Sequence, residues 1–292
     1  MAKGSRAKTA TSCCLFCGRP WTPGVVRKSK EHPLAGWIKQ QEENHPPEHM
    51  AYSTGMILGA DLSGFVQVRP EITYKKAPLL TVHTRDVCKD CNTGWMSALE
   101  ETAKPVILQM AQAAQSGIAL ALSREHARVL ALWTQKTALA YELTSDTDRV
   151  GTAAMGQEVR AGRPLRGSQV WAARNTRDSD IGVALAQIDV SATPVPEPGP
   201  PDRRGLMVEI VYHHISMLIF IADSPGQAWP QLSPVKWTLI WPSFGPAEFP
   251  PLGSVTADER TDVLTKTGRW IPPVQVPVIR QPDLPPVVRR RN

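Results

Sequence analysis

The sequence contains no apolar segment long enough to cross a membrane. Its strongest apolar run, from Ile215 to Ala222, is far shorter than the about 20 residues that a membrane-spanning helix requires. The first residues, MAKGSRAKTATSCC, also lack the apolar centre of a secretory signal peptide. These absences argue against a membrane-embedded or secreted protein, and we expect a cytoplasmic one.

Cysteine is also scarce, and all five cysteines lie in two short segments. A framework of scattered disulfides is therefore not expected. The cysteines form two Cys-x-x-Cys pairs, Cys14 with Cys17 and Cys88 with Cys91. This spacing lets four thiolates close a tetrahedral zinc site. Cys13 could replace Cys14, but its larger gap to Cys17 fits a zinc knuckle less well.

The two pairs predict a structural zinc centre rather than a redox site. Redox Cys-x-x-Cys motifs occur singly at the start of a helix, whereas two matched pairs are present here. Gly18 follows the first pair, where the chain must turn, and a helical segment follows the second. This order predicts a treble-clef layout. Four thiolate ligands leave no open position on the zinc, so its role would be structural.

The chain has a formal net charge of +6, and two groups of its basic residues lie near the two ends. Arg289, Arg290 and Arg291 lie next to the last residue. The basic residues before Glu31, the first acidic residue, are Lys3, Arg6, Lys8, Arg19, Arg27, Lys28 and Lys30. Basic segments beside a zinc module can attract phosphates independently of base sequence. Basic termini that only increase solubility are the simpler alternative.

Length and composition suit one large domain or two modest ones, with 292 residues of which 42% are hydrophobic. The local patterns divide the chain into four parts. They are a basic disordered start, a domain with the cysteine pairs and a helical extension, an antiparallel β domain and a proline-rich basic tail, at residues 1–12, 13–145, 168–271 and 272–292. The predicted fold class is therefore α+β.

Two helices are predicted after the second cysteine pair. The first runs from Trp95 to Gln115, and Pro105 would split it into two short helices or kink it, because proline removes a backbone donor. The second begins after Ser123, a good N-cap, and its apolar residues keep helical spacing to about Leu143. The segment from Gly151 to Gly167 is predicted to be a loop.

Extended segments rich in Val, Ile, Tyr and Trp follow and are separated by turn residues. They are Gln169–Thr176, Ile181–Val190, Leu206–Ala222 and Val235–Trp241. The third is long enough for one bent strand or for a hairpin through His213-His214. Residues 191–205 form a proline-rich segment that predicts a loop, and the proline-rich tail after Ile271 is expected to be extended.

A Glu-His pair lies between the two cysteine pairs. Glu31-His32 is followed by four residues and then by Trp37-Ile38, and the second cysteine pair lies in the segment VCKDCNTGWMSALE, Val87–Glu100. These residues resemble the signature of HNH endonucleases of actinobacterial and phage genomes. The resemblance covers about residues 13–140, including the helix that carries Lys136.

The resemblance implies a zinc-stabilised treble-clef (ββα-metal) nuclease core that hydrolyses or nicks DNA with the help of a divalent ion. His32 would be the general base, because imidazole titrates near neutral pH and can accept a proton from water. Glu31 would hold the catalytic Mg²⁺ or Mn²⁺, which prefers oxygen ligands. Asn92 would orient His32 or give its amide oxygen to this ion.

The sequence departs from the family pattern at two places. Many HNH enzymes carry a His shortly after the Asn, whereas the next His after Asn92 here is His126, far outside the motif. Glu100, about two helical turns beyond Asn92, is the best substitute ligand, and Glu101 would point to the opposite side. Pro33 follows His32 directly, whereas the family usually places its proline a few residues later.

Other histidines fit the pattern less well. The Glu-His dipeptide recurs at Glu48-His49 and Glu125-His126, but neither copy is followed by a Trp and an aliphatic residue at the same distance. His213 and His214 are predicted to be structural residues of a strand. His83 would be a strand residue beside the second cysteine pair, where it could contact a phosphate.

Three functions are consistent with these residues. The first is metal-dependent cleavage or nicking of DNA, with double-stranded DNA as the expected partner. The second is a zinc-stabilised nucleic-acid-binding protein without catalysis, because the same basic residues would serve it. The third is a restriction or defence effector whose β region senses a modified base or a partner, which rests on domain order alone.

Overall fold

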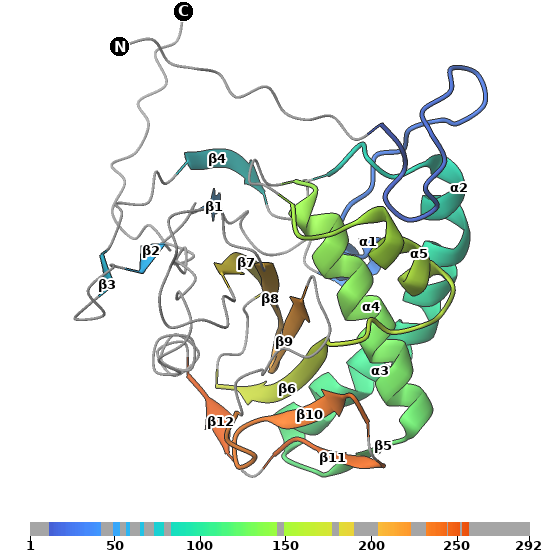
Figure 1. The fold of residues 1–292 in the computed structure, drawn as a ribbon. Coiled ribbons are helices and arrows are strands. Elements are labelled where there is room, and N and C mark those ends of the chain that lie inside the picture. The colour runs from blue at the N-terminus through green and yellow to red at the C-terminus, as the bar shows by residue number, and fades with distance from the viewer. Residues whose placement is uncertain are drawn as a thin grey trace, which may run out of the picture.

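The computed structural model has an α+β fold, as predicted, in which a mostly antiparallel sheet packs against helices (Figure 1). The structure describes residues 12–41, 49–52, 57–58, 65–66, 73–78, 83–144, 149–176, 181–189, 204–222, 232–243, 245–251 and 253–256. The predicted tail 272–292 and nearly all of the predicted segment 1–12 lie outside these residues. None of the described helices has the length and apolar character needed to cross a membrane.

The central sheet has the strand order β10-β6-β9-β8-β7, with antiparallel neighbours, and β12 pairs parallel with β6. The strands are β6 (Gln169–Asn175), β7 (Ile181–Asp189), β8 (Arg204–Tyr212), β9 (Ile215–Ala222), β10 (Thr238–Trp241) and β12 (Ser254–Val255). β9 is buried along its whole length, because apolar clusters cover both faces of the sheet at this strand. Burial on both faces explains why β9 is the strongest apolar run of the sequence.

β8 and β9 form the hairpin that the sequence allowed as one of two alternatives. Tyr212 pairs with Ile215, so His213 and His214 are the turn between the strands rather than strand residues. His213 has a φ of 49°, the left-handed conformation that two-residue hairpin turns require. The expectation that these histidines lie within a strand is therefore wrong, because the chain reverses at this point.

α3 (Ser97–Ser116) is one continuous helix, so of the two alternatives expected at Pro105, two short helices or a kink, the division into two helices is wrong. Pro105 lies on the exposed side of the helix, and the carbonyl group of Glu101 that loses its helical partner belongs to an exposed residue. Water can hydrate that carbonyl group, so the helix continues. The buried face includes Ala103, Ile107 and Met110.

α4 (Arg124–Glu142) begins as predicted, because Oγ of Ser123 accepts a hydrogen bond from the His126 amide at 3.1 Å. The helix contacts α3, α5 and the sheet, and Figure 1 shows α3 and α4 side by side. Every residue from Val129 to its end is buried. Polar residues in such a helix need internal partners, and Gln135 bonds to the Ser168 hydroxyl at 2.7 Å.

α5 (Ala153–Arg160) lies in the segment that the sequence predicts to be a loop. Thr152 is its N-cap and accepts a hydrogen bond from the Met155 amide at 3.2 Å. Gly156 packs directly against the backbone of the first cysteine pair, and a Cβ at this position would overlap the carbonyl oxygen of Leu15. The loop prediction failed because tertiary packing stabilises this short, glycine-containing helix.

Several short elements complete the fold. α1 (Gly36–Gln41) follows the Glu-His pair, and α2 (Lys89–Cys91) and the π-helix η2 (Asn92–Met96) lead into α3 with a kink at Gly94. Within the described parts of the chain, three two-stranded sheets pair β1 (His49–Tyr52) with β4 (Thr73–Pro78), β2 (Ile57–Leu58) with β3 (Phe65–Val66) and β5 (Leu120–Leu122) with β11 (Ala247–Phe249).

The main hydrophobic cluster contains residues from both predicted domains. It includes Cys14 and Cys91 of the cysteine pairs, Trp133 of α4, and Val170 and Ile219 of the sheet. The boundary between residues 145 and 168 remains a prediction. The helices that follow the cysteine pairs nevertheless share one apolar core with the sheet, so the sheet supports the site described below.

We predict that Gly156→Ala lowers the free energy of unfolding by about 1–3 kcal/mol, because the added methyl group would overpack the contact with Leu15. Thermal and denaturant unfolding measure the change. Gly36→Ala in α1 is the matched control, because a Cβ there meets no atom within 4 Å. Equal stability of the two variants would contradict the close packing of α5 on the first cysteine pair.

Candidate functional site

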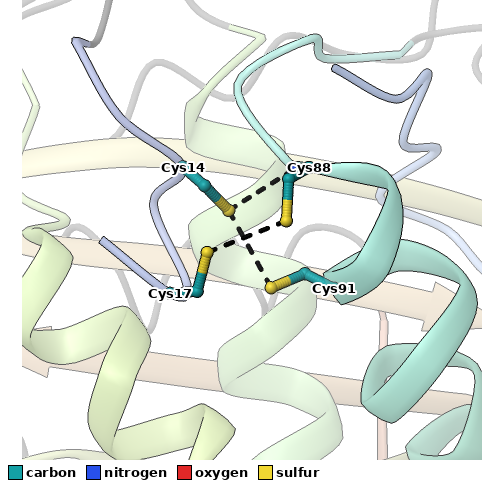
Figure 2. Close-up of side chains that lie close together, drawn as sticks. All are labelled: Cys14, Cys17, Cys88 and Cys91. Carbon is teal, nitrogen blue, oxygen red and sulfur yellow. Dashed lines mark hydrogen bonds between the residues drawn. The ribbon is translucent and has the colours of Figure 1, made fainter. Parts of the chain in front are cut away.

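The four cysteines predicted as ligands lie together in space (Figure 2). The Sγ atoms of Cys14 and Cys91 are 3.9 Å apart and those of Cys17 and Cys88 are 3.7 Å apart, and all four lie within 4.8 Å of one another. Tetrahedral coordination with metal–sulfur bonds of about 2.3 Å requires sulfur–sulfur distances of about 3.8 Å. The four side chains are therefore positioned to hold one metal ion. Cys13 does not belong to the group.

Local backbone geometry positions the two cysteine pairs. The Gly18 amide donates to the carbonyl of Cys14 at 2.9 Å, and Gly18 has a φ of 69°, so the chain turns after the first pair as expected. The Cys88 amide donates to Sγ of Cys14 at 3.3 Å, which links the two pairs. The hydrogen bond between Cys14 and Cys91 lowers the pKa of Cys14 and raises the pKa of Cys91, so Cys14 is the member of this pair that more readily forms a thiolate.

Arg19 contacts the cluster in a way that sequence reasoning missed. Its guanidinium donates to Sγ of Cys17 and to Sγ of Cys88, each at 3.4 Å, and to Asp90 at 2.6 Å. Four thiolates around a divalent ion carry a net negative charge, which a neighbouring cation offsets. In the sequence Arg19 counted only as one of many basic residues. Its position two residues after Cys17 is the signal that could have identified it.

Purified protein is expected to contain one tightly bound zinc ion per chain, because four thiolates are the ligand set of structural zinc. Cys88→Ser should remove the metal and destabilise the fold, since structural zinc contributes about 10 kcal/mol in small metal modules. Elemental analysis and thermal unfolding measure both effects. Cys13→Ser is the control, and unchanged stability of Cys88→Ser would contradict the metal centre.

Arg19→Ala should weaken metal binding about 10- to 100-fold, as expected for loss of a group that hydrogen-bonds to metal ligands. Competition with a chromogenic chelator measures the affinity. Arg27→Ala removes an exposed arginine of the same region and should leave the affinity unchanged. An affinity of Arg19→Ala equal to that of the wild type would show that the guanidinium contacts do not support the ligands.

The segment before His32 pairs with the segment before the second cysteine pair. Residues 27–31 and 84–89 are antiparallel and linked by backbone hydrogen bonds, among them Ser29 to Val87 at 2.9 Å. Glu31 and Thr84 exchange two hydrogen bonds of 3.0 and 2.8 Å. This pairing brings His32 next to His83, and their rings are in edge contact with centroids 5.8 Å apart. Both histidines are exposed.

Asn92 contacts the same paired segment from the start of the helical region. Its amide nitrogen donates to the carbonyl of Lys30 at 3.2 Å and to the hydroxyl of Ser29. Asn92 thus contacts the paired segment, residues 27–31, that directly precedes His32. The contact uses the amide nitrogen of Asn92 and not its amide oxygen, so both roles expected for Asn92 stay predictions.

Glu31 and Glu100, the two expected ligands of a catalytic ion, converge on Lys136 of α4. The Lys136 ammonium lies 2.6 Å from Glu100 and 3.5 Å from Glu31. Burial raises the pKa of Glu31 to about 7, although the charge of Lys136 opposes this shift. Burial also acts to lower the pKa of Lys136, but the charges of Glu100 and Glu31 outweigh it and raise that pKa. Glu101 is exposed, as expected.

This arrangement does not fit the oxygen-ligated site that a catalytic Mg²⁺ or Mn²⁺ would need. An ammonium contacts both carboxylates where the ion was expected. Among the residues that the structure describes, the cysteine cluster is the only group of three or more His, Cys, Asp or Glu side chains that could hold a metal.

Of the other Glu-His pairs, Glu48 lies outside the described residues, and His126 is half-buried in the first turn of α4.

Comparison with known proteins gives no relative: the chain matches no protein-family model, no curated protein and no solved structure.

Proposed function

We propose that this protein is an HNH-type endonuclease that cleaves DNA, with His32 as general base and a treble-clef core held by structural zinc. One observation carries the proposal. His32 is exposed and directly follows residues 27–31, which pair antiparallel with residues 84–89. The second of these segments leads into α2, and both helix and segment carry cysteines of the cluster. This order of two extended segments and a helix, with metal-binding cysteines, is the layout expected of a ββα-metal nuclease.

The chemistry requires a group that takes a proton from the attacking water. An imidazole titrates near neutral pH and can accept this proton, and the exposure of His32 lets a phosphodiester approach it. Asn92 fixes the preceding residues, and His83 lies beside the base on the exposed side. A divalent ion would stabilise the leaving oxygen, but the carboxylates expected to bind it contact Lys136 instead.

Exposed basic residues on the two paired segments support DNA as the partner. They are Arg27, Lys28, Lys30, Arg85 and Lys89. Their side chains lie on the same short segments as His32 and His83, so a phosphate backbone attracted to them would approach the proposed base. Such contacts depend on counterion release and therefore weaken steeply with salt.

The buried ammonium favours a second candidate function. If no ion can bind between Glu31 and Glu100, the same basic segments would serve a zinc-stabilised nucleic-acid-binding protein without catalysis. The two functions differ in one observable, which is whether wild-type protein converts supercoiled DNA into nicked or linear forms.

His32→Ala should reduce plasmid cleavage by about two to four orders of magnitude, because the general base is lost, while DNA binding stays nearly unchanged. Cleavage of supercoiled plasmid with Mg²⁺ or Mn²⁺, and a salt titration of binding, measure the two properties. Glu101→Ala, an exposed substitution in α3, is the control and should cleave like the wild type.

Two results would contradict the role of His32 or the proposed nuclease function. A strong defect in His83→Ala with none in His32→Ala would move the base to the neighbouring ring. Wild-type protein that binds DNA but never cuts it with either ion would favour the non-catalytic binding protein.

A further inference from the structure

Lys136 contacts the chain on both sides of His32. Its side chain is fully buried near the middle of α4, with 0% of its surface exposed. The ammonium lies 3.5 Å from the carboxylate of Glu31, the residue before His32. It also donates to the carbonyl oxygen of Pro33, the residue after His32, at 3.5 Å. One buried cation therefore contacts both neighbours of the proposed base.

A buried ammonium is costly unless it is paired, so Lys136 needs strong partners. Glu100 of α3 supplies the closest one, at 2.6 Å, and its side chain is 18% exposed. The Nζ atom of Lys136 in α4 thus contacts both α3 and the segment around His32. Removal of the ammonium would leave two carboxylates facing each other in a largely buried site, which is strongly destabilising.

The contacts also determine which side chains face outward. Glu31 and Pro33 are buried, whereas His32 between them is exposed. The backbone of Glu31 is fixed on its other side by two hydrogen bonds with Thr84, the neighbour of His83. With both neighbours held toward the interior, the imidazole of His32 is directed to the surface and meets the ring of His83.

We infer that Lys136 is a positioning residue whose buried ammonium holds Glu31 and Pro33 and thereby places the imidazole of His32 beside His83. The inferred placement concerns the structure alone, whereas its effect on DNA cleavage rests on the proposed function. In this role Glu31 and Glu100 are partners of an internal cation. The cation belongs to α4, far along the sequence from the two segments that it connects.

The test uses the double variant Lys136→Met/Glu100→Gln in the full chain. This variant leaves Glu31 as the only ionisable member of the buried group, so folding does not require burial of two facing carboxylates. Thr137→Val is the matched control on the next position of α4. The Thr137 hydroxyl is buried and has no hydrogen-bond partner among the described residues, so its replacement should change nothing nearby. Metal content and thermal unfolding confirm that each variant is folded.

Two measurements then decide the inference without reference to activity. In protein labelled at histidine, wild type and Thr137→Val should show a nuclear Overhauser effect between the rings of His32 and His83. The double variant should lose this signal, and the amides of Glu31 and Thr84 should exchange faster with solvent. Retention of the ring contact and of the slow exchange in the folded double variant would overturn the inference.

Cleavage kinetics add the functional consequence. A displacement of His32 by about 1 Å should lower kcat about 100-fold, while KM for DNA changes less than twofold, because the exposed basic residues are unaltered. An unchanged kcat in the folded double variant would contradict the positioning role in catalysis. If the wild type does not cleave DNA, the proposed function fails, while the ring contact and the amide exchange still decide the structural inference.

Discussion

The four-cysteine cluster is the constraint on which the proposed site depends. It joins Cys14 and Cys17 to Cys88 and Cys91, two segments that are distant in the sequence, with sulfur–sulfur distances that suit a tetrahedral metal ion. Once these segments are held together, residues 27–31 can pair with residues 84–89. The residues around the cluster share one apolar core with α4 and the sheet, and Gly156 of α5 packs against the backbone of Leu15.

A second constraint comes from charge. α4 is surrounded by α3, α5 and the sheet, and its buried residues Gln135 and Lys136 bond to groups outside the helix. Lys136 is the strongest case, because a buried ammonium without partners would be expelled or neutralised. Its pairing with Glu100 and Glu31 connects the helical layer to the segment that carries His32. The cysteine cluster and this ion-pair group therefore lie at the two ends of the paired segments 27–31 and 84–89.

Much of the local structure could be predicted from residue patterns. The N-cap of α4 at Ser123, the strands β6 to β10 and the four ligands follow from spacing and propensity, which act over a few residues. The continuity of α3 through Pro105 and the existence of α5 could not be predicted in this way. Exposure of Pro105 and the contact of Gly156 with Leu15 decide them, and both depend on neighbours that are remote in the sequence.

The sequence by itself determined the cysteine ligands, the α+β class and the Glu31-His32 motif, because each is encoded by residue type at short spacing. Only the tertiary structure decided the surroundings of that motif. It placed His83 beside His32, turned Asn92 toward Lys30, and put the ammonium of Lys136 between Glu31 and Glu100. The physical reason is that the interaction of a buried charge with another group depends on their distance in space, and residue spacing along the chain does not give that distance.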